Sequence, residues 1–139
     1  MSRKLIFASG LLLCFSCTLD PELQTTISTE KDVIKLHLVK HIREFVRQSP
    51  LEILAKSIRQ FSVSDRVQED LFSSYSRFLE ILADDESRKR LETLRAEHAA
   101  KDPVFLKVKE ISSVFERCLD HIFFENPQLA PLIRKYGVF

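Results

Sequence analysis

Apolar residues recur at every third or fourth position through most of the chain from residue 30 onward. This spacing places them along one side of an α-helix, and no segment shows the strict alternation of a half-buried strand. The pattern predicts an all-α protein, a compact bundle of five or six helices joined by short turns. The principal stripes are Ile34, Leu38, Ile42, Phe45 and Val46; Leu51, Leu54, Ile58 and Phe61; Val67, Leu71, Tyr75, Phe78 and Leu82; Val104, Val108, Ile111, Phe115, Cys118, Leu119 and Ile122; and Leu129, Leu132, Ile133 and Tyr136.

Three of the predicted helix starts pair a polar residue with a following proline. The polar side chain caps the first backbone N–H groups, and proline fits the first turn because no donor is needed there. These pairs are Ser49-Pro50, Asp102-Pro103 and Asn126-Pro127. Glu52 can complete a capping box with Ser49. Thr29 with Asp32 predicts the first helix start in the same way, and Gly137 is predicted to end the last helix.

The stripe that ends at Leu82 does not continue on the same face, because Leu91 and Leu94 project to nearly the opposite side. Asp84 and Asp85 are natural helix caps. We therefore expect a break or kink between residues 84 and 87, followed by a charged, largely solvent-facing helix over residues 87–101.

The first sixteen residues have a different character from the rest of the chain. Arg3 and Lys4 precede an apolar run from Leu5 to Phe15. The run has about eleven residues, whereas a membrane-spanning helix needs about twenty. A basic start, a short apolar run and the small residue Ser16 form the layout of a cleaved secretory signal peptide.

The motif Leu-Cys-Phe-Ser-Cys at residues 13–17 resembles the lipobox of bacterial lipoproteins. The resemblance implies cleavage after Ser16 and acylation of Cys17. It departs from the usual motif at Cys14, where leucine is common, and at the bulky Phe15; it is similar to the relaxed motifs tolerated in spirochaetes. The resemblance covers residues 1–17 only and implies a signal peptide over residues 1–16. Beyond Cys17 the chain has a proline, several hydroxyl residues and no sustained periodicity, which predicts a lipid-attached tether over 17–29, and the helical periodicity predicts a helical domain over 30–139. The implied location is the extracytoplasmic (periplasmic or surface) side of the cell membrane or outer membrane.

Two alternatives remain for this segment. One is a conventional cleaved signal, after which an unmodified Cys17 could form a disulfide with Cys118. The other is an uncleaved amphipathic or buried N-terminal helix. The apolar run is apolar on all sides, which disfavours the uncleaved helix. Cleavage at Cys17 would remove Arg3 and Lys4 and no acidic residue, so the formal net charge would fall from +1 to −1.

Composition excludes several functional classes. The 139 residues contain only two glycines, so the glycine-rich phosphate loops of nucleotide enzymes cannot be built. The formal net charge of +1 gives no overall attraction to nucleic acid or to anionic lipid surfaces, and no nucleic-acid partner is expected.

One pair of residues has the spacing of metal ligands. His37 and His41 lie one helical turn apart, and Glu30 falls on roughly the same side. Two imidazoles and a carboxylate can hold zinc, copper or iron, and a haem between helices is a related alternative. Both histidines also lie at the polar edge of the stripe, where surface histidines are common, and no glutamate completes an H-E-x-x-H motif.

Cys118 lies within an apolar stripe, which favours an inert buried thiol over a nucleophile. Several phenylalanines lie off the main stripes, and they either fill further core layers or line an apolar groove for a partner helix or lipid. These are Phe72, Phe105, Phe123, Phe124 and Phe139.

No catalytic constellation can be assembled from these residues. The sequence therefore predicts a non-enzymatic, lipid-anchored, extracytoplasmic helical protein that contacts the membrane through Cys17 and binds a protein partner or serves the cell envelope. No cofactor is expected. The alternative is a metal- or haem-binding bundle that uses His37 and His41.

Overall fold

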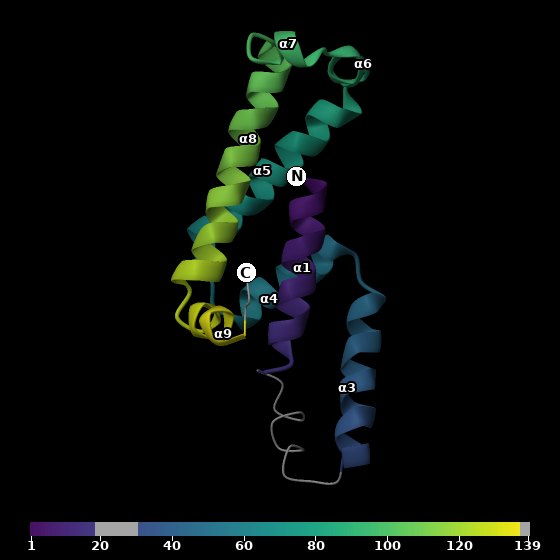
Figure 1. Ribbon diagram of the computed structural model, residues 1–139, viewed down its shortest axis with the longest axis vertical. Helices are drawn as coiled ribbons and strands as arrows, with labels where there is room; N and C mark the ends of the chain where they lie inside the picture. The colour runs from purple at the N-terminus through teal and green to yellow at the C-terminus, as the bar shows by residue number, and fades with distance from the viewer. Residues whose placement is uncertain (19–30, 137–139) are drawn as a thin grey trace. The chain divides into compact units, whose positions relative to one another are not determined.

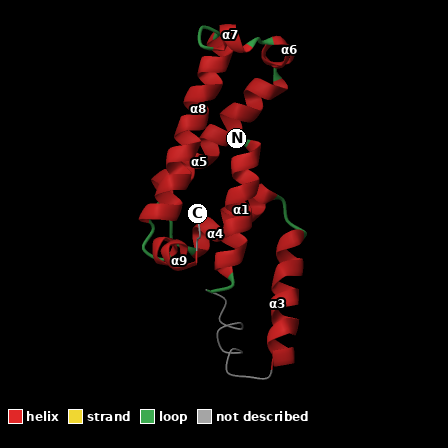
Figure 2. Ribbon diagram, viewed as in Figure 1, coloured by secondary structure: helices red, strands yellow, loops and turns green. Residues whose placement is uncertain are grey.

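The computed structural model describes residues 1–18 and 31–136, and every regular element within these ranges is a helix (Figures 1 and 2). The prediction of an all-α protein is confirmed. The elements are α1 (Ser2–Ser16), α3 (Lys31–Val46), α4 (Pro50–Gln60), α5 (Asp65–Ala83), α6 (Asp85–Thr93), α7 (Ala96–Ala99), α8 (Pro103–Asp120), the π-helical turn η1 (His121–Glu125) and α9 (Leu129–Tyr136).

The described residues form more helices than the five or six predicted. One addition is α1, because the opening segment is itself helical. The other arises because the predicted helix over residues 87–101 is divided: α6 ends at Thr93, Leu94 is extended, and α7 is a single short turn. Neither α6 nor α7 has a buried residue, as their charged sequences predict.

The predicted break after the third helix is confirmed. The helix α5 ends at Ala83, and Asp84 adopts an extended conformation with ψ 113°. The Asp84 carboxylate then accepts a hydrogen bond of 2.9 Å from the Ser87 backbone N–H and so caps α6. The local capping chemistry thus ends one helix and begins the next within a single residue.

The chain divides into two compact units. The first consists of Ser64–Phe123 with Met1, and the second of Ser2–Val63 with Phe124–Phe139. In the first unit α5 and α8 pack side by side (Figure 1). The aromatic rings of Tyr75 on α5 and Phe115 on α8 have their centroids 6.1 Å apart, and Phe115 is fully buried. The predicted stripe of α8 supplies four buried residues, Ile111, Phe115, Cys118 and Leu119. In the predicted stripe of α5 only Leu71 is fully buried, and the other buried apolar residue of that helix, Ile81, lies outside the predicted stripe.

The second unit contains the packing of α1 against α4. The buried residues of α1 recur at helical spacing, and those of α4 lie on the apolar side of a strongly amphipathic helix. Because burial of a full aliphatic side chain contributes about 1.5–3 kcal/mol, this contact is a major source of stability for the unit. The buried apolar side chains are Leu5, Ala8, Leu12 and Phe15 on α1 and Ile53, Leu54 and Ile58 on α4.

The prediction that the apolar stripe of the first domain helix, α3, is buried was wrong for most of its length. Leu38, Ile42 and Val46 are exposed, and only Phe45 is buried. The side chain of Ile34 lies outside the described residues. The physical reason is that periodicity predicts which side of a helix is apolar, but not whether another element covers that side; among the described side chains of α3 only Phe45, near its C-terminal end, is buried. There the Phe45 ring contacts His41 and the Lys56 ammonium, 4.8 and 5.0 Å from the ring centroid.

The predicted caps of α4 and α8 are confirmed. The Ser49 N–H donates to the Glu52 carboxylate at 2.6 Å, and the Glu52 N–H donates back to the Ser49 hydroxyl at 3.3 Å. Asp102 caps α8 through the N–H groups of Val104 and Phe105. The predicted caps at Thr29–Asp32 and Gly137 lie outside the described residues.

The end of α4 uses serine where glycine is usual. Ser62 has a φ of 51°, in the left-handed region that favours glycine. The Val63 N–H donates to the Ile58 carbonyl at 3.1 Å and the Ser62 N–H to the Arg59 carbonyl at 3.2 Å. This pair of bonds is the Schellman arrangement, which satisfies the last carbonyls of the helix.

Asn126 joins the end of α4 to the start of α9. Its side-chain oxygen accepts hydrogen bonds from the backbone N–H groups of Gln128 and Leu129, as predicted for a cap, although α9 begins two residues later than Pro127. Its side-chain N–H₂ donates to the Phe61 carbonyl at 2.8 Å. Asn126 is buried, so each of these groups would be left without a partner if the amide were removed.

We expect Asn126→Ala to lower the free energy of unfolding by about 2–4 kcal/mol, because it removes a helix cap and leaves the buried Phe61 carbonyl unsatisfied. Asn126→Ser is the matched control: its hydroxyl oxygen can still cap α9, but the side chain is too short to donate to the Phe61 carbonyl. In urea denaturation, the free energy of unfolding of this variant should fall between those of the wild type and Asn126→Ala. Equal stability of all three proteins would contradict this role.

Candidate functional site

The predicted processing site lies where α1 ends. Ser16 is the last residue of α1 and is fully buried. Its hydroxyl donates to the Leu13 carbonyl at 2.8 Å and lies 3.0 Å from Nε2 of His41 on α3. Cys17 follows directly and is half-buried, with Sγ 3.6 Å from the Leu13 carbonyl. Cys14, one turn earlier, is exposed.

Burial of Ser16 has a consequence for processing. A peptidase must hold the residues on both sides of the scissile bond in an extended form, whereas here the residue before the bond is helical and inaccessible. Cleavage between Ser16 and Cys17 therefore requires a chain in which α1 has not yet packed on α4. A chain crossing a membrane unfolded meets this condition.

The two candidate metal ligands lie on one helix and are both half-buried. His41 contacts the Ser16 hydroxyl and the Phe45 ring. Within residues 1–18 and 31–136, no group of three histidine, cysteine, aspartate or glutamate side chains converges on a common point. The third predicted ligand, Glu30, lies outside the described residues. The contact between His41 and Ser16 joins residues far apart in the chain and has no signal in the sequence.

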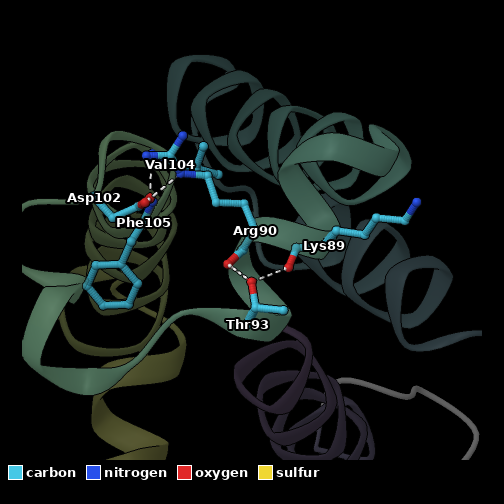
Figure 3. Close-up of polar contacts among 6 residues, drawn as sticks. All are labelled: Lys89, Arg90, Thr93, Asp102, Val104 and Phe105. Carbon is cyan, nitrogen blue, oxygen red and sulfur yellow. Dashed lines mark hydrogen bonds and ion pairs between the residues drawn. The ribbon is translucent and has the colours of Figure 1, made fainter.

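The best-defined polar cluster belongs to the first unit. Arg90 extends from α6 to the buried Asp102 at the start of α8, with Nε 2.6 Å from Oδ2 (Figure 3). The other carboxylate oxygen accepts hydrogen bonds of 2.9 Å from both the Val104 and the Phe105 N–H. The hydrogen bond from the Phe105 N–H, then the bond from the Arg90 guanidinium, lower the pKa of the Asp102 carboxyl.

Both carboxylate oxygens of Asp102 are engaged within the chain, so the role of this residue is structural. It fixes the connection through α6 and α7 to the first turn of α8. Thr93 completes the end of α6 by donating to the Lys89 carbonyl at 2.9 Å (Figure 3). Asp102 is predictable as a cap from the sequence, whereas Arg90 is not predictable as its partner, because only the folded connection brings the two residues together.

The remaining candidates behave as core or surface groups. Cys118 is buried, as predicted, and desolvation, followed by the nearby Asp70 carboxylate, raises the pKa of its thiol, which disfavours the reactive thiolate. Among the off-stripe phenylalanines, Phe123 is buried, Phe72 and Phe105 are half-buried, and Phe124 is exposed. Phe139 lies outside the described residues.

Comparison with known proteins finds no matching family model, no similar curated protein and no similar solved structure. None of the helices in the described part of the chain combines the length and apolar character needed to cross a bilayer.

Stability should depend on the charge of Asp102 in acid. Because folding lowers the pKa of this carboxyl, its contribution is complete above the ordinary aspartate pKa of about 4 and is lost as pH falls through the lowered value. Asp102→Asn keeps the capping oxygen but removes the charge. Urea denaturation should show wild type more stable near neutral pH, with the difference shrinking in acid.

Arg90→Gln provides the control for this measurement. When Asp102→Asn is already present, adding Arg90→Gln should change the free energy of unfolding little, because the ion pair between the two residues has already been lost. A stability difference between wild type and Asp102→Asn that is the same at neutral and acid pH would contradict the assignment.

Proposed function

We propose that this chain is a lipid-anchored extracytoplasmic protein whose helical body acts as a non-enzymatic interaction module. The supporting observation is that the predicted signal segment is a discrete helix, α1, that ends at Ser16, directly before the cysteine of the lipobox-like motif. Cleavage at this boundary would remove one complete element and place Cys17 at the new N-terminus for attachment to the membrane.

The same boundary suggests how an interaction surface arises. Leu5, Ala8 and Leu12 of α1 are buried, and α1 packs on α4. When α1 is removed, the apolar side of α4 loses its cover. An exposed apolar helix face of this kind is a common docking site for an amphipathic partner helix. Processing would thus create the binding surface at the moment it creates the anchor.

The anchor is tested by the mass of the protein isolated from membranes of a bacterium that expresses the full chain. We expect a chain that begins at an acylated Cys17. Cys17→Ser should abolish acylation and leave the chain unprocessed, whereas the matched control Cys14→Ser should be processed normally. A wild-type protein that still begins at Met1, or that carries an unmodified Cys17 thiol, would overturn the proposal.

The interaction surface is tested by measuring amide hydrogen exchange in two proteins, the processed wild type and the unprocessed Cys17→Ser variant, in the same detergent. Peptides covering α4 should exchange at least about tenfold faster in the processed protein than in unprocessed Cys17→Ser, because local opening becomes easier without the α1 contact. Peptides covering α5 and α8 serve as the internal reference and should be unchanged. Equal protection of α4 in both proteins would mean that its apolar side stays covered and would refute the interaction surface alone.

A further inference from the structure

The helix α3 exposes apolar side chains along a large part of its length. Leu36 and Val46 are 70% and 72% exposed, and Val39 and Ile42 are exposed at 42% and 39%. Soluble proteins carry scattered apolar residues on their surfaces, but a run of them on one helix marks a contact site. These four residues occupy an arc of roughly one third of the helix circumference.

Basic side chains flank this apolar arc. Leu36 and Val39 line a shallow depression of about 430 Å³ together with Lys40, Arg43, Glu44 and Arg47. Spacings of three and four residues place these side chains along one side of α3. No ion pair joins Lys40, Arg43 or Arg47 to another residue in the described part of the chain. The near-zero net charge of the whole protein conceals this local excess.

We propose that α3 is a membrane-surface helix that binds bilayers containing anionic phospholipids. Its apolar arc would enter the boundary between headgroups and acyl chains, and Lys40, Arg43 and Arg47 would contact lipid phosphates. The combination of an apolar strip with flanking lysine and arginine is typical of interfacial helices, whose long basic side chains extend toward the headgroups.

Charge complementarity favours a lipid surface over two other occupants. A second copy of α3 packed on this face would bring Lys40, Arg43 and Arg47 close to their own counterparts, which is repulsive. Nucleic acid would engage the basic side chains but would leave Leu36, Val39 and Val46 without an apolar environment. An anionic bilayer satisfies both features at once.

The position of α3 along the chain supports the same assignment. It is the first described helix after Cys17, and the connecting residues span at most about 45 Å when extended. If Cys17 is acylated, α3 is confined near the lipid at a high effective concentration. That confinement depends on the proposed anchor, whereas the affinity of α3 for lipid does not.

The experiment uses the full chain carrying Cys17→Ser, so that acylation plays no part in the result. Flotation with vesicles of phosphatidylcholine alone is compared with vesicles that also contain phosphatidylglycerol. We expect binding to the anionic vesicles, weaker binding to the neutral ones, and a steep loss with added salt as the charges are screened. Equal binding to both kinds of vesicle would overturn the proposal.

A triple variant, Lys40→Gln, Arg43→Gln and Arg47→Gln, should weaken binding to anionic vesicles roughly a hundredfold at low salt. The matched control is Arg77→Gln, Lys107→Gln and Lys109→Gln, which removes three exposed charges from α5 and α8 and should bind as the parent does. Arg3 and Lys4 are present in every protein, so their contribution is constant. Unchanged binding by the α3 variant, or an equal loss in the control, would overturn the assignment.

A second variant, Leu36→Ser, Val39→Ser and Val46→Ser, tests the apolar arc while the charges remain. It should lose vesicle binding at salt concentrations where the parent still binds, with unchanged helical circular dichroism. Sedimentation without lipid tests whether α3 binds a second copy of the chain instead. If the parent protein is dimeric and this variant is monomeric, α3 binds a second copy, and the lipid assignment is refuted.

Discussion

The contact between α1 and α4 is the constraint on which the second unit depends. Each helix contributes a fully buried leucine, Leu12 from α1 and Leu54 from α4. Ser16, at the end of α1, is also fully buried and lies beside His41 of α3. The helix α3 makes no comparably extensive contact within the described residues, and most of its apolar stripe is exposed. An N-terminal segment that is removed on export would therefore have effects well beyond its own length.

Burial of Ser16 relates folding to processing. While α1 is packed, the bond before Cys17 is part of a helical, inaccessible region; before it packs, the bond is available. If the chain is processed as proposed, cleavage and folding of this segment compete, and their order would determine which surface the protein presents. In the proposed mature form, α4 and α3 both carry apolar surface, and one faces a partner protein while the other faces lipid. The proposed anchor at Cys17 would keep both near the membrane.

Polar residues define the helix boundaries in a chain that has almost no glycine. Ser49 with Glu52, Asp84 and Asp102 each begin a helix through a local side-chain bond, and all three were predictable because the groups involved are neighbours in sequence. The end of α4 was less predictable. There Ser62 takes the left-handed conformation that glycine usually supplies, and Asn126 reaches back to the Phe61 carbonyl from the distant start of α9.

The sequence by itself determined the helical class, most helix boundaries and the break at Asp84, because periodicity and capping are local properties. It also correctly placed Cys118 inside an apolar stripe. Only the tertiary structure decided which apolar faces are covered. The stripe of α3 has the same periodicity as that of α8, yet α8 packs on α5 while α3 is largely exposed. The contacts of Ser16 with His41 and of Arg90 with Asp102 likewise required the fold, since each joins residues that no local pattern relates.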